Sequence, residues 1–439
     1  MTDSTFAAVV MAGGMGTRMR SSVPKHLHPI LGRRMVDWVL AAARPLGPEP
    51  LVVVSSPETR AAFDGVPVAV QERPLGTGDA VRTARAAVDG AATLLVLSGD
   101  TPLLTGALLA ALLETHRREE AAATVLSFEL DEPGSYGRVL RSADGSVTGI
   151  VEAVDATPEE LAVRECNSSI YVFAAARLWP ALDALTPHNA QGELYLTDVV
   201  RELVAGGERV VAHRAADSGE TAGVNTRVEL AAAAAALRDR INLEHMLAGV
   251  SIVDPASTWI EPTVELEPDS TIHPFTVLRA ATRVATGAEV GPHVVAIDAE
   301  IGAGATVGPF CYLRPGTILG PGSKAGTFVE LKQAQIGAGT KVPHLSYIGD
   351  AEIGEGTNIG AGTITANFPH RPGQPKGKTT IGDNVRVGVD TMFVAPVTVG
   401  DDAWTSAGAV VTDDVPANAL AGFPPRQVTK EGRGGKRDD

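Results

Sequence analysis

Residues 301–331 read IGAGATVGPFCYLRPGTILGPGSKAGTFVEL, and an apolar residue returns at every sixth position, from Ile301 through Val307 to Leu331. Hexapeptides of this kind form one flat strand per repeat and three strands per coil, with the apolar side chain inside a narrow prism. Glycine and other small residues suit the corners of that prism. The stretch therefore predicts a left-handed parallel β-helix.

The same step extends the predicted β-helix over residues 250–422. It includes Val284 and Val290 before the quoted stretch, and after it a series at 336–359 with two steps of five residues, one of them leading into it, and a series at 381–411 in which every step is six. Residues 365–380 interrupt the repeat, so we expect a loop that leaves the prism and carries function or meets a neighbouring subunit. Residues 423–439 predict a disordered tail.

The first half of the chain has a different pattern, in which short β-branched runs alternate with alanine-rich stretches. The runs at 7–10, 51–54 and 93–97 predict strands, and the stretches at 35–43 and 79–88 predict helices. Such alternation is typical of a parallel sheet covered by helices, an α/β architecture. Residues 226–249 have high helix propensity. We therefore expect a domain over 1–225, a helical linker over 226–249, and the β-helix.

Composition and charge exclude several classes of partner. The 439-residue chain carries a net charge of -15, whereas nucleic-acid or anionic-membrane binding needs an extended basic face. Its two cysteines, Cys166 and Cys311, match no metal-ligand spacing and are expected to be free buried thiols in a reducing cytoplasm. The apolar run at 6–12 is too short for a signal or membrane-spanning segment. We expect a cytoplasmic protein.

A glycine-rich segment follows the first predicted strand directly. Residues 11–19 read MAGGMGTRM, and Lys25 follows a proline shortly after Arg18. Glycines let backbone N–H groups approach phosphates closely, and the two basic side chains can neutralise phosphate charge and a departing pyrophosphate. A glycine turn alone would fit an ordinary strand-to-helix connection equally well. The added arginine and lysine favour phosphate binding.

A carboxylate stands at the end of a central predicted strand. Asp100 follows the run at 93–97, at the edge where open α/β sheets bind ligands. Phosphoryl chemistry needs a hard cation beside the phosphate oxygens, and Asp100 is a candidate Mg²⁺ ligand. Taken alone, an aspartate here is as readily explained as a helix cap or turn residue.

These segments together resemble the sugar-1-phosphate nucleotidylyltransferase family, which implies an α/β Rossmann-like nucleotidyltransferase domain. Nearly the whole chain resembles the bacterial bifunctional N-acetylglucosamine-1-phosphate uridylyltransferases/glucosamine-1-phosphate N-acetyltransferases. The resemblance implies that Arg18 and Lys25 are catalytic and that Asp100 with Asn225 holds Mg²⁺. It also implies a UTP and sugar site made of Met11, Ala12, Gly13, Gly14, Gln71, Gly76, Thr77, Gly99, Gly137, Glu152, Asn167 and Asn225.

The β-helix carries a second set of polar motifs, among them Leu313-Arg314-Pro, Val329-Glu330-Leu-Lys332 and Pro343-His344. A lone histidine is more often packed or solvated than a catalytic base. The same resemblance implies acetyl transfer from acetyl-CoA, with His344 as general base and Glu330 as its orienting partner. It further implies an acceptor site of Arg314, Lys332, Tyr347, Asn358 and Lys376, and an acetyl-CoA site of Asn367, Phe368, Val389, Ala407 and Arg426.

The resemblance also implies a homotrimer, because acetyl sites of that family are completed by neighbouring subunits. The chain departs from the family pattern in places. Asp79 replaces a usual histidine, Ser169 stands where the family has glycine, and Val389 replaces a serine; Arg426 is displaced by two positions. The alternatives are a uridylyltransferase whose β-helix only assembles a trimer, a paralogue serving another sugar phosphate or acyl donor, and a non-enzymatic trimeric scaffold.

Overall fold

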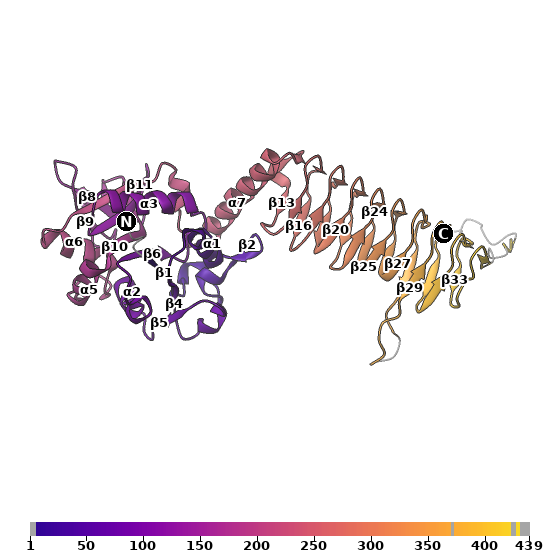
Figure 1. The fold of residues 1–439 in the computed structure, drawn as a ribbon, viewed down its shortest axis with the longest axis horizontal. Coiled ribbons are helices and arrows are strands. Elements are labelled where there is room, and N and C mark those ends of the chain that lie inside the picture. The colour runs from indigo at the N-terminus through magenta and orange to yellow at the C-terminus, as the bar shows by residue number, and fades with distance from the viewer. Residues whose placement is uncertain (1–5, 370–372, 423–426, 431–439) are drawn as a thin grey trace, which may run out of the picture. The chain divides into compact units, whose positions relative to one another are not determined.

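A computed structural model of the chain describes residues 6–369, 373–422 and 427–430. The chain divides into two compact units, Met1–Leu237 and Arg238–Asp439 (Figure 1). The boundary between them falls inside the long helix α7, Arg227–Leu247. In the part of the chain that the structure describes, no helix combines the length and the apolar character that crossing a membrane requires.

The first unit is built on a nine-stranded sheet whose main path runs in the order β11-β7-β10-β6-β1-β4-β5, with β8 and β9 as a side hairpin. A short hairpin of β2 and β3 stands apart from it. The strands are β1 Phe6–Ala12, β2 Pro29–Ile30, β3 Arg33–Arg34, β4 Leu51–Ser55, β5 Val68–Val70, β6 Thr93–Ser98, β7 Ala123–Glu129, β8 Arg138–Arg141, β9 Val147–Val151, β10 Glu165–Ala174 and β11 Val210–Arg214.

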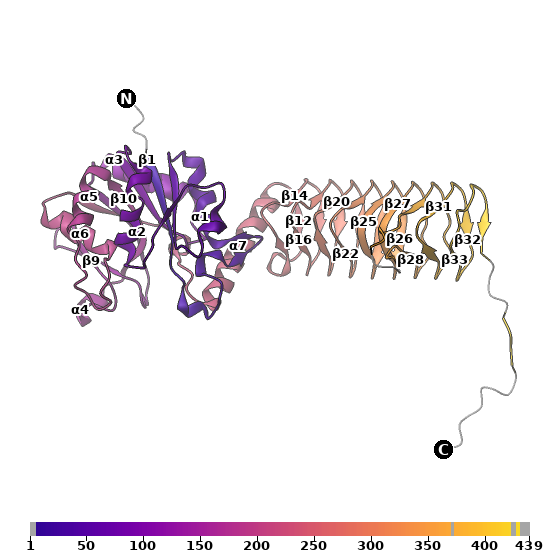
Figure 2. The ribbon, with the colours of Figure 1, turned by 90° about the horizontal axis from the view of Figure 1, so that it is seen from below.

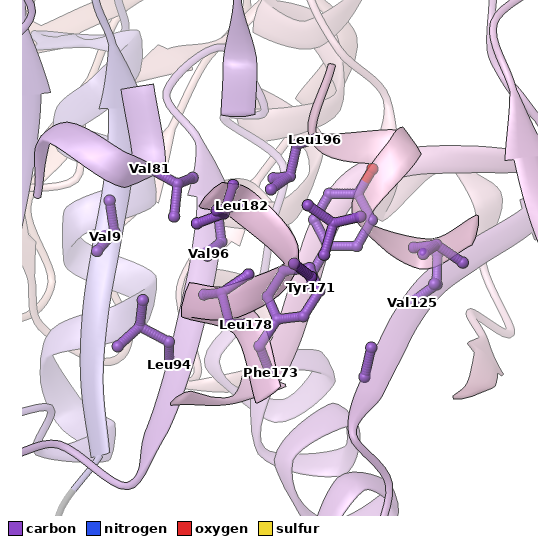
Figure 3. Close-up of a cluster of buried hydrophobic side chains, with 14 of the residues drawn as sticks. Val9, Val81, Leu94, Val96, Val125, Tyr171, Phe173, Leu178, Leu182 and Leu196 are labelled. Carbon is purple, nitrogen blue, oxygen red and sulfur yellow. The ribbon is translucent and has the colours of Figure 1, made fainter. Parts of the chain in front are cut away.

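Helices cover both faces of this sheet because its strands are apolar on both sides. Val9 points to one core, shared with Val81 and Leu178, whereas Val10 points to the other, shared with Val36. Figure 3 shows the first of these clusters. The helices are α1 Met35–Ala43, α2 Thr77–Thr83, α3 Gly106–Arg118, α4 Pro158–Leu161, α5 Ala175–Asp183 and α6 Leu196–Ala205; α2, α5 and α6 contribute to the first core, α1 and α3 to the second.

The expected α/β architecture is confirmed, but the sheet is mixed and not wholly parallel. β1 pairs in parallel with both β4 and β6, whereas β10 runs antiparallel between β6 and β7. The chain reaches β10 from the β8–β9 hairpin, and this excursion returns it in the opposite direction. Alternation of strand and helix along the sequence does not reveal such a reversal, and mixed sheets of this kind are common.

The second unit is the predicted left-handed parallel β-helix, and its short strands stack coil on coil (Figure 2). Ile272 pairs with Val290 and Val307 pairs with Ala325, each a step of 18 residues, or three hexapeptides. The inward residues at these positions are buried, and each large aliphatic one contributes about 1.5–3 kcal/mol through loss of water contact.

Its strands are β12 Ser251–Ile252, β13 Trp259–Ile260, β14 Glu265–Leu266, β15 Thr271–Ile272, β16 Val277–Arg279, β17 Arg283–Val284, β18 Glu289–Val290, β19 Val295–Ile297, β20 Ala299–Ile301, β21 Thr306–Val307, β22 Tyr312–Leu313, β23 Thr317–Leu319, β24 Lys324–Thr327, β25 Glu330–Ile336, β26 Lys341–His344, β27 Tyr347–Ile353, β28 Ile364–Ala366, β29 Thr379–Ile381, β30 Met392–Val394, β31 Val397–Val399, β32 Trp404–Thr405, β33 Val410–Val411 and β34 Leu420–Ala421.

Two features of the β-helix differ in extent from the sequence pattern. The coils begin at β12, well before the first clear repeat residue Val284, because Ile252 already pairs in register with Ile272. The interruption after β28 lengthens one coil: Ile353 pairs with Ile381, a step of 28 residues. The extra residues form the expected loop, which leaves the stack between β28 and β29 (Figure 1).

Candidate functional site

The glycine loop after β1 is shaped by close backbone approaches. Gly16 has φ +71°, and a Cβ on it would lie 2.5 Å from the Cβ of Lys25. A Cβ on Gly13 would lie 3.2 Å from Oε1 of Gln71. The Met15 carbonyl accepts a hydrogen bond from the backbone N–H of Lys25 at 3.2 Å. The loop therefore packs directly against Lys25 and leaves little room for a side chain at Gly13 or Gly16.

Three segments far apart in sequence bring their polar side chains together beside this loop. The Lys25 ammonium contacts the carboxylate of Asp100 and donates to Oδ1 of Asn225 at 3.0 Å. Arg18 donates to the same Asn225 oxygen at 2.9 Å. The backbone N–H of Val224 donates to the Asp100 carbonyl at 2.9 Å, which aligns the segment carrying Asn225 with the end of β6.

Asp100 is held in its ionised form. Burial alone would raise the pKa of its carboxyl group, but the charge of Lys25 and hydrogen bonds from Lys25 and Ser98 outweigh that effect and lower the pKa below its usual value. The Ser98 hydroxyl donates to Oδ1 at 2.6 Å. The Gly99 N–H donates to the Met11 carbonyl at 2.9 Å, which ties this corner to β1.

A cavity of about 350 Å³ opens between the glycine loop, the end of β6 and the start of α2. Nine residues expected at the nucleotide site line it: Met11, Ala12, Gly13, Gly14, Lys25, Gln71, Gly76, Thr77 and Asp100. Arg18 and Asn225 reach it through their bonds to the cluster around Lys25. The wall also includes Glu193, from a stretch that the resemblance places at the wall of the sugar pocket, and five residues that the sequence motifs did not assign to the site: Pro74, Ala80, Ser98, His26 and Ser169.

At the other end of this cavity, Asp79 fixes the amide of Gln71. The Gln71 Nε2 donates to Oδ2 of Asp79 at 2.9 Å and to the Gly76 carbonyl at 3.1 Å. Arg82 holds the second Asp79 oxygen at 2.7 Å. With Nε2 engaged, Gln71 presents its Oε1 as an acceptor beside Gly13. Asp79, noted only as a departure from the family pattern, is thus a positioning residue.

Gly76 and Thr77 are locked by the segment that precedes α6. Gly76 has φ +111°, and a Cβ there would lie 2.5 Å from the Leu194 carbonyl oxygen, so only glycine fits. The Thr77 hydroxyl accepts a hydrogen bond from the Leu196 N–H at 2.9 Å. The start of α2 is therefore a rigid wall of the cavity.

His26 is a site residue that the motifs missed. It directly follows Lys25, lines the cavity, and is only 3% exposed. Among the described residues, its Nε2 has no hydrogen-bond partner. Burial is the main cause that lowers the pKa of His26 to about 4, so the ring is neutral at physiological pH. Its place next to a predicted catalytic lysine was the one signal in the sequence.

The residues expected to hold the sugar lie in two different environments, one in a second cavity and one buried within strand β10. Glu152 lines a second cavity of about 370 Å³ together with Tyr195 and Thr197. The Thr197 hydroxyl donates to Glu152 Oε1 at 3.1 Å, and burial is the main cause that raises the pKa of Glu152. A Cβ on Gly137 would lie 3.4 Å from Glu152 Oε2, so these two residues are adjacent.

Asn167 lies buried in β10 and is occupied within the protein. Its Nδ2 donates to the Tyr171 hydroxyl at 2.7 Å, and its Oδ1 accepts from the Ser169 N–H at 3.1 Å. The residue therefore shapes the backbone of β10 next to the cavity.

On the β-helix, His344 ends β26 and is exposed. Glu330 and Tyr347 are register partners on the adjacent strands β25 and β27. The Glu330 carboxylate accepts a hydrogen bond from Arg314 at 2.9 Å, so the contact that the structure gives Glu330 is with Arg314. Its expected role as orienting partner of His344 remains a prediction.

The two ends of the loop between β28 and β29 contact Asp350 of β27. Asn367 donates to the Asp350 carboxylate, and Lys376 Nζ lies 4.0 Å from the same oxygen. The side chain of Lys376 also approaches Lys332, and this contact is the main cause that lowers the pKa of Lys332. Two lysines this close concentrate positive charge at this point of the surface.

The remaining expected acetyl-site residues lie elsewhere on the prism. Asn358 is a ladder partner of Lys341 and Arg386, on the sheet that contains β26. Val389 and Ala407 are on neighbouring coils, because the Gly408 N–H donates to the Val389 carbonyl at 2.8 Å. Both are exposed, as is Phe368. Arg426 lies outside the described residues.

The two sites and folds define a transferase that joins a nucleotidyltransferase unit to a hexapeptide-repeat acyltransferase unit. Two domain families match: the MobA-like NTP transferase domain over residues 8–206 and the hexapeptide repeat of succinyl-transferase over 378–413.

Full-length relatives narrow this class. Proteins named "Bifunctional protein GlmU" from Mycobacterium tuberculosis and Kineococcus radiotolerans are 48% and 51% identical to the chain, each over 94% of the chain and 89% of the relative. One from Streptomyces avermitilis is 49% identical over 97% and 93%. The chain belongs to the bifunctional GlmU family.

Proposed function

We propose that the first unit, over residues 1–225, transfers a uridylyl group from UTP to N-acetylglucosamine-1-phosphate. The β-helix, over 250–422, makes that acceptor by N-acetylating glucosamine-1-phosphate with acetyl-CoA. The observation that carries the first activity is the Lys25 ammonium held between Asp100 and Asn225 at the mouth of the glycine loop.

In uridylyl transfer, a phosphate oxygen of the acceptor attacks the α-phosphorus of UTP, and pyrophosphate leaves. Lys25 and Arg18 bind phosphate oxygens and stabilise the charge that builds up on them. The glycine loop contributes backbone N–H groups, and Gln71 and Thr77 position the base. This transfer needs no covalent intermediate with the protein.

The residues present suit one Mg²⁺ ion. The Asp100 carboxylate and the Asn225 amide oxygen already converge on a single positive charge, that of Lys25. Within the described residues no cluster of three or more acidic, histidine or cysteine side chains could hold a metal, so these two oxygens and the substrate phosphates would be its ligands. When bound, Mg²⁺ supplies charge neutralisation at the phosphates.

In acetyl transfer, the amine nitrogen of glucosamine-1-phosphate attacks the thioester carbonyl, and coenzyme A leaves as its thiol. His344 takes the proton that the amine loses. Lys332, Lys376 and Arg314 hold the sugar phosphate, and the two adjacent lysines support that role. Val389 and Ala407 leave room for coenzyme A on the neighbouring coils.

We further propose a homotrimer working in the cytoplasm. Asn358 lies on a different sheet of the prism from the acceptor residues of β25 and β27, which supports a site completed by a second subunit. A row of exposed aromatic side chains along one corner, with Phe310 and Phe328 stacked at 5.2 Å, gives an apolar edge for such contacts. The two free cysteines suit a reducing compartment.

Two assays on the purified full chain test the proposal. Pyrophosphate release is measured with UTP, Mg²⁺ and N-acetylglucosamine-1-phosphate, and thiol release with acetyl-CoA and glucosamine-1-phosphate. Uridylyl transfer without thiol release would reduce the β-helix to an assembly scaffold. Light scattering at micromolar concentration checks the trimer, and a monomer would contradict it.

A further inference from the structure

Ser169 has a backbone conformation that residues other than glycine rarely adopt. Its φ is +62°, in the left-handed region, where a Cβ crowds the backbone. It sits at an irregularity of β10, because the register with β7 shifts between Asn167 and Tyr171. The backbone there is fixed from both sides: Ser168 donates to the Leu126 carbonyl at 2.6 Å, and Asn167 accepts from the Ser169 N–H.

Ser169 is one of the residues that line the nucleotide cavity. In the described part of the chain no hydrogen bond is recorded for its hydroxyl, whereas the neighbouring Ser168 hydroxyl is bonded and buried. Glycine would adopt the same φ without strain, so the fold itself gains nothing from a serine at this position. Strained residues that persist beside a cavity commonly serve its ligand.

The order of strands in the sheet indicates which of the two substrates, UTP or the acceptor, the Ser169 hydroxyl faces. The base-binding residue Gln71 directly follows β5, in the half of the sheet with β1, β4 and β5, whereas Ser169 belongs to β10, on the other side of β6. Strand β10 pairs antiparallel with β6 from Tyr171 onward, opposite Val96, and β6 ends at Ser98, which bonds Asp100. With the leaving pyrophosphate on the glycine loop after β1, as proposed above, an acceptor attacking in line approaches from the opposite side, that of β10.

We propose that Ser169 is a specificity-determining residue for the acceptor of uridylyl transfer. Its hydroxyl donates a hydrogen bond to an oxygen of the sugar-1-phosphate in the cavity, a contact that glycine at this position cannot make. This inference rests on the proposed uridylyl transfer and deepens it.

The test compares three variants of the full chain with the wild type. Ser169→Gly removes the hydroxyl and the strain, and Ser169→Ala removes the hydroxyl but keeps the Cβ. Glu120→Gly is the matched control, because Glu120 also has a positive φ, +46°, but is exposed just past the end of α3. KM for N-acetylglucosamine-1-phosphate at saturating UTP, KM for UTP and kcat are measured, together with the thermal unfolding midpoint.

We expect both Ser169 variants to raise the acceptor KM about three- to tenfold, the loss of one hydrogen bond, with KM for UTP unchanged. Ser169→Gly should unfold at or above the wild-type midpoint, and Glu120→Gly should keep wild-type kinetics. An unchanged acceptor KM in Ser169→Ala, or a change in KM for UTP instead, would overturn the inference. A wild type without uridylyl transfer would overturn the proposed function and the inference with it.

Discussion

Replacing Asp100 by asparagine tests the cluster at the mouth of the glycine loop. The substitution keeps the size of the side chain but removes the negative charge that contacts Lys25 and accepts from Ser98 at 2.6 Å. Lys25 would keep only its bond of 3.0 Å to Asn225. The side chains of Lys25 and Asp100 are each only 17% exposed, so water replaces the lost interaction poorly.

The size of the effect follows from these contacts. A hydrogen bond to a charged group contributes about 1.5–3 kcal/mol, which corresponds to roughly 10- to 100-fold in rate. Losing a formal charge beside a bound Mg²⁺ adds a loss of several kcal/mol. We therefore expect Asp100→Asn to lower kcat/KM for uridylyl transfer about 10³- to 10⁵-fold and to raise the Mg²⁺ concentration for half-maximal activity.

The assay is pyrophosphate release across a Mg²⁺ series, with acetyl transfer measured on the same preparation. Asp37→Asn is the matched control, since Asp37 pairs with Arg34 through two bonds of 2.7 Å in the same unit and neither residue lines the cavity. It should lose stability but keep wild-type kinetics. Loss of both transferase activities in a folded Asp100→Asn protein, or an unchanged Mg²⁺ requirement, would refute the reasoning.

Three further outcomes are expected. His344→Ala should lower acetyl transfer about 10²- to 10⁴-fold and leave uridylyl transfer intact, and unchanged thiol release would remove the base assignment. Lys376→Met should raise the pKa of Lys332 in an NMR titration, because contact with Lys376 is the main cause that lowers it; no shift would contradict that pairing. Burial alone would raise the pKa of Glu165, yet bonds from Arg141 and a serine lower it overall, so this carboxylate stabilises the fold above its unfolded pKa. Glu165→Gln should therefore lower the free energy of unfolding, measured in urea at pH 7, by about 1–3 kcal/mol. The difference in unfolding free energy between the variant and the wild type should shrink as the pH falls below 4.5, and a constant difference would contradict this reasoning.

Much of the architecture could be predicted because its signals are local. A hexapeptide step specifies which side chains point inward wherever it occurs, so the stretch from Ile301 to Leu331 was enough to predict the prism. The clear repeat begins only at Val284, although the coils begin at β12, since early coils such as that of Ile252 lack the repeated glycines. The glycine loop with Arg18 and Lys25 was equally readable, because phosphate binding uses adjacent backbone groups.

The chemistry of the sites depends on contacts between residues far apart in the sequence, and no repeating sequence pattern predicts such contacts. Tertiary structure alone decided that Lys25 lies between Asp100 and Asn225, and that Glu330 pairs with Arg314. It also reversed β10, which a strand-and-helix alternation cannot reveal, and it gave Ser169 a left-handed backbone beside the cavity. Local periodicity determines which face of a strand is buried, whereas the partner of a polar side chain is settled by packing of the whole chain.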